Sequence, residues 1–354
     1  MKRSTIYDIA EMAGVSVTTV TRAFKKGSSI RPETRDRILR LSEDFNYTPN
    51  MNAVRLAKKT VVIGAILDTR SEELYNELKL GLEAACKNLA GFKVDLEIRS
   101  LPKESIGTDY CEKLLDELLE VGVQGLILLL VDYLDGFIQK VNEAVDNGLF
   151  VTLLINECDR IKRTFSVNSQ PKMSGRIAAE LLSTSISGNE VAVFIGNSNP
   201  IVHQETISGF RQEAEERDLS IVEVSDFKEN LELSRIQTRE VVRKYPGLGG
   251  VFVTSANSDA IVDELVRSGL AGSKIKIVTT DLYPQIANNI ESGAVLATIY
   301  KNPYQQAKSS FELLFKHING TDENMDDIYI IPQIIIKGNL PAFKRDSVVF
   351  SNEA

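Results

Sequence analysis

The sequence has few of the residues on which catalysis and metal binding usually depend. Its 354 residues include two histidines, His203 and His317, and three cysteines without C-x-x-C spacing. Histidine is the usual base of a nucleophilic triad and a common zinc ligand, so sites of either kind are poorly supported. The odd set of cysteines, Cys86, Cys111 and Cys158, is typical of reduced thiols in a cytosolic protein. We therefore expect no metal, no cofactor and no enzymatic activity.

Long apolar runs are also missing. The most apolar segment, GLILLLV at 125–131, is too short to cross a bilayer. The first ten residues, MKRSTIYDIA, lack the apolar segment of a secretory signal. A Gly-rich phosphate-binding loop, which a sugar-kinase-like enzyme would need, does not occur. We expect a cytoplasmic protein that has no contact with a membrane.

Charge is divided unevenly along the chain. Residues 1–60 contain 12 Lys and Arg against 6 Asp and Glu, a net charge of +6. The remaining residues contain 29 basic and 43 acidic side chains, a net charge of −14. A basic segment joined to an acidic body favours contact of that segment with a polyanion. The alternative is a chance fluctuation of solvated surface charge.

Residues 5–45 predict three short helices. Thr5 can cap the first helix with Asp8 as its capping-box partner, and Ser16 can cap the second. Gly14 permits a sharp turn between these two helices. We expect the core of this segment to contain apolar residues from all three helices: Ala10, Met12, Ala13, Val20, Phe24, Ile38, Leu39, Leu41 and Phe45.

From Thr60 onward, short apolar segments alternate with longer amphipathic segments. This alternation predicts parallel sheets covered by helices on both faces, and the strands are too many for one ordinary sheet. The predicted fold class is α/β, with two doubly wound parallel lobes. The expected strands are 61–67, 92–98, 125–131, 149–155, 190–196, 249–254 and 274–280, and the expected helices lie near 71–90, 109–121, 135–148, 171–187, 202–217 and 257–268.

The first two predicted helices and the turn between them have the spacing of a helix-turn-helix unit. Such a unit places its second helix in the major groove of DNA. Threonine hydroxyls can donate or accept hydrogen bonds at base edges, and Arg22 can bridge guanine O6 and N7. On spacing alone, a three-helix bundle with only a packing role is the alternative.

Three segments carry a resemblance to a known family: TIYDIAEMAGVSVTTVTRAF, TRDRILRLSEDFNYTPN and LAKKTVVIGAI. Over about residues 4–66 the chain closely resembles the head of the lactose/galactose repressor family of bacterial transcription regulators. The rest resembles, more loosely, the effector domain of that family and the periplasmic sugar-binding proteins. The resemblance implies a helix-turn-helix head (1–49), a hinge helix (50–59), a two-lobed effector-binding and dimerisation domain of the type I periplasmic-binding-protein kind (60–340), and a C-terminal tail (341–354).

The resemblance also implies which residues contact DNA. Val17, Thr18 and Arg22 correspond to the base readers, and Leu56 corresponds to a wedge that enters the minor groove and bends the DNA. Arg31 stands where relatives often have a Ser or Asn cap. The residues that correspond to backbone-positioning or hinge contacts are Thr5, Tyr7, Ser16, Thr19, Thr21, Asn50 and Ala53.

The predicted effector site lies at the carboxyl ends of the strands, where open parallel sheets bind ligands. Carboxylates and amides there suit vicinal hydroxyls, and Tyr75, Tyr133 and Tyr283 can stack on a sugar ring. A helix cap or a solvated loop is the alternative for each polar residue. The candidates are Asp68, Arg70, Tyr75, Asp132, Tyr133, Asn156, Asn168, Gln170, Asn197 and His203.

The stretch TTDLYPQIANNIESGAVLATIYKNPYQQAKSS (279–310) resembles a pattern of the sugar-binding family, and this makes Asp281 the strongest effector candidate. Lys301 stands where that pattern usually has Gln. Thr206 stands where many relatives have an effector-binding Arg. Both differences argue against a standard hexose or pentose, and Lys301 leaves room for an acidic or phosphorylated ligand.

Together these features predict a DNA-binding repressor that is switched by a small polar effector, a sugar or sugar derivative. We expect a homodimer on a pseudo-palindromic double-stranded DNA operator, because two heads then match two half-sites. The tail LPAFKRDSVVFSNEA has no leucine heptad of the kind that family tetramers use. The alternatives are a regulator controlled by a protein partner, or a binding protein or enzyme that uses the sugar-binding lobes.

Overall fold

The computed structural model describes residues 5–24, 30–45, 47, 60–105, 109–130, 133–198, 201–228, 230–255, 258–320 and 325–346. The chain divides into two compact units, Met1–Thr60 and Val61–Ala354. The expected hinge helix (50–59), with Asn50, Ala53 and Leu56, lies outside the described residues, as does Asp132.

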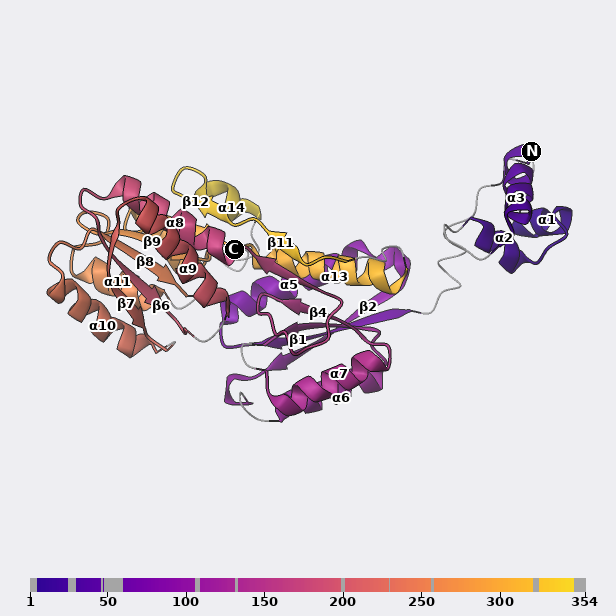
Figure 1. Ribbon diagram of the computed structural model, residues 1–354, viewed down its shortest axis with the longest axis horizontal. Helices are drawn as coiled ribbons and strands as arrows, with labels where there is room; N and C mark the ends of the chain where they lie inside the picture. Colours follow the sequence, from indigo (N-terminus) through magenta and orange to yellow (C-terminus); the bar gives the residue numbers. More distant parts are fainter. Residues whose placement is uncertain are drawn as a thin grey trace. The chain divides into compact units, whose positions relative to one another are not determined.

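The first unit contains the three expected helices, α1 (Ile6–Met12), α2 (Val17–Ala23) and α3 (Pro32–Asp44) (Figure 1). Thr5 and Asp8 form the predicted capping box: Thr5 N donates to Asp8 Oδ2 at 2.7 Å, and Asp8 N donates to Thr5 Oγ1 at 3.4 Å. Ser16 Oγ accepts from Thr19 N at 3.2 Å and so caps α2. Gly14 has a φ of 60°, which allows the sharp turn between α1 and α2.

The three helices enclose a small apolar core. The prediction that Met12, Phe24 and Phe45 belong to it is wrong, because they are 41%, 37% and 47% exposed. Ile9 takes the inward position on α1, since it shares a face with Ala10 and Ala13, whereas Met12 lies nearly opposite Ala10 on the helix. The buried residues of this core are Ile9, Ala10, Ala13, Val20, Ala23, Ile38 and Tyr47.

The second unit is built on two six-stranded sheets, which define lobe 1 and lobe 2. The strand order is β11-β5-β4-β3-β1-β2 in lobe 1 and β12-β10-β9-β8-β6-β7 in lobe 2. All neighbouring strands are parallel except β10 and β12. The strands of lobe 1 are β1 (Val61–Asp68), β2 (Val94–Leu101), β3 (Gly125–Leu129), β4 (Phe150–Leu154), β5 (Phe165–Ser169) and β11 (Ile328–Ile330). Those of lobe 2 are β6 (Glu190–Ile195), β7 (Ser220–Asp226), β8 (Gly250–Thr254), β9 (Lys276–Thr280), β10 (Ala297–Tyr300) and β12 (Gln333–Ile335).

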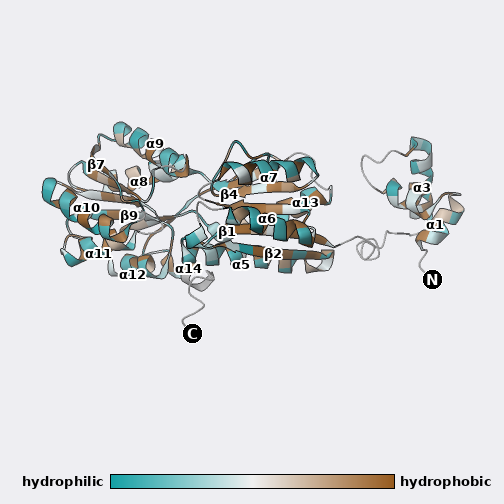
Figure 2. Cartoon of the chain, turned by 90° about the horizontal axis from the view of Figure 1, so that it is seen from below, coloured by the Kyte–Doolittle hydropathy of each residue, from teal (hydrophilic) through white to brown (hydrophobic). Residues whose placement is uncertain are grey.

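Helices cover both faces of each sheet, as the α/β prediction requires. In lobe 1, α5 and α13 pack on one face, and α6 and α7 pack on the other (Figure 1). Figure 2 shows hydrophobic strands inside both lobes and hydrophilic stretches on the helices. The helices of lobe 1 are α5 (Glu72–Asn88), α6 (Tyr110–Val121), α7 (Asp135–Asp146) and α13 (Pro303–Ile318). Those of lobe 2 are α8 (Pro171–Ser185), α9 (Ile201–Glu216), α10 (Leu231–Lys244), α11 (Asp259–Arg267), α12 (Pro284–Ser292) and α14 (Leu340–Asp346).

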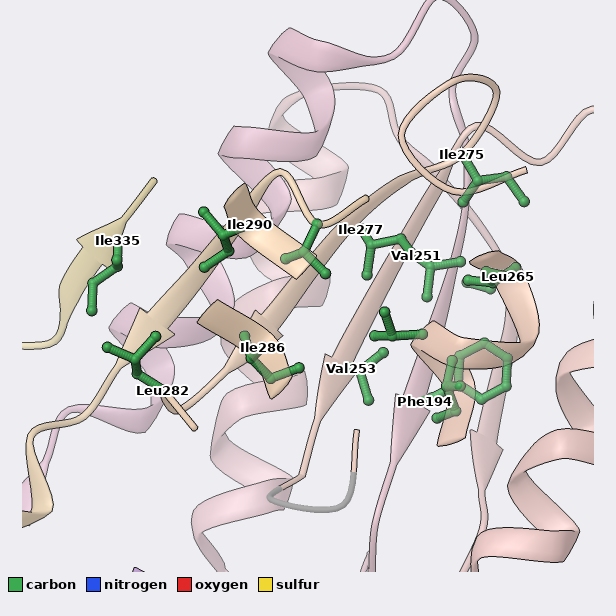
Figure 3. Close-up of a cluster of buried hydrophobic side chains, with 14 of the residues drawn as sticks. Phe194, Val251, Val253, Leu265, Ile275, Ile277, Leu282, Ile286, Ile290 and Ile335 are labelled. Carbon is green, nitrogen blue, oxygen red and sulfur yellow. The ribbon is translucent and has the colours of Figure 1, made fainter. Parts of the chain in front are cut away.

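The core of lobe 2 shows how alternate strand residues divide between the two faces of a sheet. Val251 and Val253 of β8 pack in one buried cluster with Leu265 of α11 and Ile286 of α12 (Figure 3). Phe252, between the two valines, belongs to the cluster on the opposite face. This two-residue period is the one expected of a strand that is buried on both sides.

The chain passes between the lobes three times. It leaves lobe 1 between β5 and α8, returns between β10 and α13, and leaves again between β11 and β12. Each lobe is therefore assembled from separate pieces of sequence. Asn168 in β5 and Tyr300 in β10 lie beside the first and second crossings, and Lys301 lies within the second.

The predicted fold class is confirmed, and all seven predicted strands and six predicted helices of the second unit are present within three residues of their expected ends. The sequence analysis did not predict β5, β7, β10, β11, β12 or helices α10, α12 and α13. α14 begins at Leu340, which is buried in the core of lobe 2, so this helix continues the second lobe into the expected tail.

Candidate functional site

The predicted base readers lie on α2, which the fold presents with one buried and one exposed face. Val20 and Ala23 are buried, whereas Thr18 and Arg22 are exposed and lie four residues apart on the same side of the helix. Val17 is partly buried beside them. Of the described DNA candidates on α1, Thr5 caps the helix and Tyr7 is 73% exposed.

Three hydroxyls near α2 take part in local hydrogen bonds. Thr21 Oγ1 donates to the carbonyl of Val17 at 3.0 Å, and the hydroxyls of Ser16 and Thr19 lie 2.9 Å apart. Each hydroxyl oxygen keeps acceptor capacity, but the donor of Thr21 is already used. These contacts fix the side chains of Ser16, Thr19 and Thr21 at the start of α2. Fixed side chains suit contacts to the DNA backbone, which position the helix, better than contacts to bases.

The effector candidates of lobe 1 take part in local hydrogen bonds and one ion pair. Asp68, the last residue of β1, accepts from Arg70 Nε at 3.0 and 3.2 Å, and Arg70 Nη2 lies 2.8 Å from Asp68 Oδ2. Tyr75 directs its hydroxyl to Ser100 Oγ at 2.9 Å, and Asn156 Nδ2 donates to the carbonyl of Leu130 at 3.1 Å. These hydrogen bonds and this ion pair all lie within lobe 1.

Asn168 is buried within β5, beside the first crossing between the lobes. Its Nδ2 donates to Glu157 Oε1 at 2.5 Å and to Ser166 Oγ at 3.3 Å, while its Oδ1 has no hydrogen-bond partner. Glu157 also accepts from Ser166 Oγ at 3.2 Å. Glu157 was not predicted, because it follows an expected strand without any pattern that distinguishes it from other loop carboxylates.

Asp281 lies directly after β9, as expected for an effector residue, and is 4% exposed. Lys301 Nζ lies 2.9 Å from Asp281 Oδ2, while Asp281 Oδ1 has no hydrogen-bond partner. The Lys301 carbonyl accepts from Gln306 Nε2 at 2.7 Å. Asp281, the strongest sequence candidate, and Lys301 are therefore in direct contact, in a partly buried ion pair at the second crossing.

The backbone of Asp281 is left-handed, with a φ of 70°, and Ile155 in lobe 1 has a φ of 67°. These two residues directly follow β9 and β4, which are each third in the strand order of their sheets. Left-handed conformations are costly for residues other than glycine, most of all for β-branched residues, and they are frequent at functional sites. The two lobes thus share the same backbone turn at equivalent strand ends.

Glu77 is a buried carboxyl group that the sequence analysis missed. It lies on the inward face of α5 with Leu78, Gly81 and Leu82, and it is 3% exposed. Its Oε2 accepts from the hydroxyl of Tyr300 at 2.9 Å, so this hydrogen bond joins α5 of lobe 1 to β10 of lobe 2. The signal for Glu77 was a charged residue within an apolar helical stripe, which a search limited to strand ends does not examine.

Burial and charge change the ionisation of groups around Asp281. Burial raises the pKa of Glu77 from 4.5 to about 8, the Tyr300 hydroxyl opposes this shift, and the charge of Asp281 adds to it. Burial, together with the charge of Lys301, lowers the pKa of His203 on α9 from 6.5 to about 4. At neutral pH both side chains are uncharged.

Within the described residues, no three His, Cys, Asp or Glu side chains are placed to hold a metal ion. In the same part of the chain, every helix is too short or too polar to cross a membrane.

Comparison with known proteins supports the two-part organisation. Residues 63–322 match the family of periplasmic binding protein domains, and residues 5–50 match the bacterial regulatory proteins of the lacI family. The chain belongs to the lacI family of regulators that have a periplasmic-binding-protein-like second domain.

Several curated relatives are regulators. The chain is 25% identical over 343 residues to the HTH-type transcriptional regulator pepR1 of Lactobacillus delbrueckii, an alignment that covers 94% of this chain and 96% of pepR1. It is 26% identical to the HTH-type transcriptional regulator DegA of Bacillus subtilis over 62% of this chain and 64% of DegA. It is 31% identical to the lactose operon repressor of Escherichia coli, over 36% of this chain and 34% of the repressor. The match thus spans less than two thirds of DegA and about a third of the lactose repressor.

Solved structures share the fold of the second unit. A putative LacI transcriptional regulator from Bacteroides fragilis superposes with a TM-score of 0.69 at 18% identity, covering 80% of this chain and 99% of that one. A solute-binding protein from Burkholderia graminis in complex with D-arabinose gives a TM-score of 0.71 at 16% identity, covering 80% and 97%.

Proposed function

We propose that this protein is a DNA-binding transcription repressor that acts as a homodimer and is switched by a small polar effector, a sugar or sugar derivative. The observation that carries the proposal is α2, a capped helix that exposes Thr18 and Arg22 from a helix-turn-helix head. The net charge of +6 on residues 1–60 supports contact of this head with the phosphates of operator DNA. Bacterial operators lie in the cytoplasm, which is the proposed location of the protein.

The proposed dimer follows from the size of the head. One short recognition helix reads only a few base pairs, so two heads on a pseudo-palindromic operator are needed for useful specificity. In the proposed complex, Val17, Thr18 and Arg22 contact bases. Thr5, Tyr7, Ser16, Thr19 and Thr21 hold the phosphate backbone, and the hinge residues Asn50, Ala53 and Leu56 reach the minor groove.

The proposed effector site is centred on Asp281. An ionised carboxylate at the end of a parallel strand accepts hydrogen bonds from ligand hydroxyls, and Asp281 Oδ1 is buried without a partner. Lys301, His203, Asn197 and Asn168 are the further proposed contacts. In a two-lobed domain a ligand that favours the closed arrangement shifts the population of lobe arrangements, and this shift is the proposed link to operator affinity.

An operator titration tests the DNA-binding proposal. The operator is first selected from a random duplex library, and affinity is then measured at several salt concentrations. Affinity should fall steeply with salt because phosphate contacts release counterions. Arg22→Ala should weaken binding by about 1–3 kcal/mol and relax the preference at one base pair. Arg40→Ala removes the same charge from an exposed position on α3 and should leave base preference unchanged.

Two results would contradict the proposal. One is an affinity for the selected operator that does not depend on salt. The other is a base preference that is the same in Arg22→Ala, Arg40→Ala and the unmodified protein.

A further inference from the structure

Several buried polar atoms around Asp281 have no hydrogen-bond partner. They include the hydroxyls of Thr280 and Tyr283 and three carboxyl or amide oxygens. Glu77 Oε1, Asp281 Oδ1 and Gln306 Oε1 are buried and have no hydrogen-bond partner. All three residues are less than 5% exposed, and each has its other polar atom engaged with Tyr300 or Lys301. A buried carboxyl oxygen without a partner is costly, so this arrangement favours a ligand that brings donors.

The cations proposed for the effector site are already paired with carboxylates. Lys301 Nζ is 2.9 Å from Asp281 Oδ2, and Arg70 Nη2 is 2.8 Å from Asp68 Oδ2. His203 is neutral at neutral pH, because its pKa is lowered to about 4. An acidic or phosphorylated ligand would have to compete with Asp281 for Lys301, and its negative charge would lie near Glu77 and Asp281.

We propose that Glu77 and Asp281 together bind a protonated amine, so that the effector is an amino sugar or a similar polyhydroxylated amine. This proposal rests on the proposed function, in which the cluster is the effector site. An ammonium group has three donors and no acceptor. It therefore matches the unpartnered oxygens of Asp281 and Gln306 and, once Glu77 has lost its proton, that of Glu77. Its positive charge compensates a second carboxylate beside the Asp281–Lys301 pair, and the remaining hydroxyls of the ligand can donate to Gln306 Oε1.

The ionisation of Glu77 couples to such a ligand. Glu77 faces the Tyr300 hydroxyl and the backbone of Tyr304, and it interacts with the charge of Asp281, which Lys301 pairs. Tyr283 also interacts with Glu77. Without ligand, Glu77 is protonated at neutral pH because its pKa is about 8. An adjacent ammonium favours the carboxylate, so binding of an amine should release a proton to the solvent.

The test uses the full chain and matched sets of ligands: glucosamine, glucose and gluconate, and galactosamine, galactose and galactonate. Thermal shift and calorimetric titration measure each affinity. In at least one set the amine should bind about tenfold or more tightly than the neutral sugar, and the acid should bind least. Calorimetry at about pH 6.5 in two buffers of different ionisation enthalpy should show proton release with the amine and none with the neutral sugar.

Glu77→Gln removes the ionisable group at nearly constant size. It should lower the affinity for the amine about tenfold or more, with little change for the neutral sugar, and it should abolish proton release. Glu83→Gln makes the same change on the exposed face of α5 and should alter neither affinity. If Glu77→Gln does not fold, the proton release of the unmodified protein remains the deciding measurement.

The proposal is overturned if the neutral or acidic member binds as tightly as the amine in both sets, if neither amine binds, or if amine binding releases no proton. Tight binding of a neutral sugar would leave the proposed effector function in place and remove only the amine. Failure of the proposed DNA-binding function would appear separately, in the operator titration.

Discussion

Gly175 of α8 and Gly209 of α9 lie at a mutual close crossing of these two helices. A Cβ atom on Gly175 would meet the carbonyl oxygen of Thr206, and a Cβ atom on Gly209 would meet the carbonyl oxygen of Lys172. In both cases the neighbouring atom belongs to the backbone, which cannot move aside as a flexible side chain can. The absence of a side chain at both positions is therefore a condition for this packing of α8 on α9.

Gly175→Ala should destabilise lobe 2, because the added methyl group forces the two helices apart. Overpacking of this kind costs about 1–3 kcal/mol, and a backbone contact should give the upper part of that range. Gly188→Ala is the matched control, since a Cβ there meets no atom within 4 Å. Thermal unfolding measures both variants. Equal melting temperatures for Gly175→Ala and the unmodified protein would show that the helices can separate without cost.

Ser16→Ala should loosen α2 without changing its exposed face. The Ser16 hydroxyl accepts from Thr19 N at 3.2 Å, and loss of such a cap typically costs about 1 kcal/mol. Amide hydrogen exchange of the full chain should therefore become faster in α2. Thr18→Ala, at an exposed position of the same helix, should leave exchange unchanged and weaken only DNA binding. Faster exchange in Thr18→Ala than in Ser16→Ala would contradict the assignment of the cap.

Tyr300→Phe should destabilise the second unit by about 1–2 kcal/mol, because both oxygens of the buried Glu77 carboxyl group would then lack a side-chain partner. Tyr329→Phe is the control, since Tyr329 is 48% exposed. Denaturant unfolding followed by far-ultraviolet circular dichroism measures both variants. A loss in Tyr329→Phe as large as that in Tyr300→Phe would indicate that the hydrogen bond to Glu77 contributes nothing.

The contribution of Glu77 to stability should decrease as pH rises. Its folded-state pKa of about 8 is above its ordinary value of 4.5, so the folded protein holds this proton more tightly than the unfolded chain does. The stabilising contribution is complete below about pH 4.5 and is lost progressively as pH rises to about 8. The free energy of unfolding of Glu77→Gln, relative to the unmodified protein, should therefore increase between pH 5 and pH 8, by roughly 2–4 kcal/mol. The same comparison with Glu83→Gln should show no dependence on pH, and a flat difference for both variants would exclude a buried, protonated Glu77.

Much of the fold follows from local patterns in the sequence. The apolar runs that became β1, β3 and β8 are buried on both faces, so their composition alone indicated parallel strands. β5, with the sequence FSVNS, was not predicted because three of its five residues are polar. Glu157 accepts hydrogen bonds from two of them, Ser166 and Asn168, inside the protein. α13 was not predicted, because residues 279–310 were interpreted by their resemblance to a binding pattern and not by their helical periodicity.

The candidate site was predicted only in part, for a reason of topology. Asp281 and Lys301 were found because each follows a strand or matches a family pattern, but their ion pair depends on the pairing of β9 with β10. Glu77 could not be linked to them, since it is separated from Tyr300 by more than two hundred residues and meets it only where the lobes join. Contacts of this range are set by tertiary packing, which local periodicity does not encode.

The three crossings between the lobes have a consequence for synthesis of the chain. The face of lobe 1 that α5 covers is completed by Ala307, Phe311 and Leu314 of α13, which are translated after strands β6 to β10 of lobe 2. Lobe 2 in turn needs Ile335 and Leu340 from the last part of the described chain. As the chain leaves the ribosome, lobe 1 therefore keeps an uncovered apolar face while most of lobe 2 is being made. The second unit should fold late and as a whole, and ribosome-bound chains that end before Pro303 should bind chaperones that recognise exposed apolar surface.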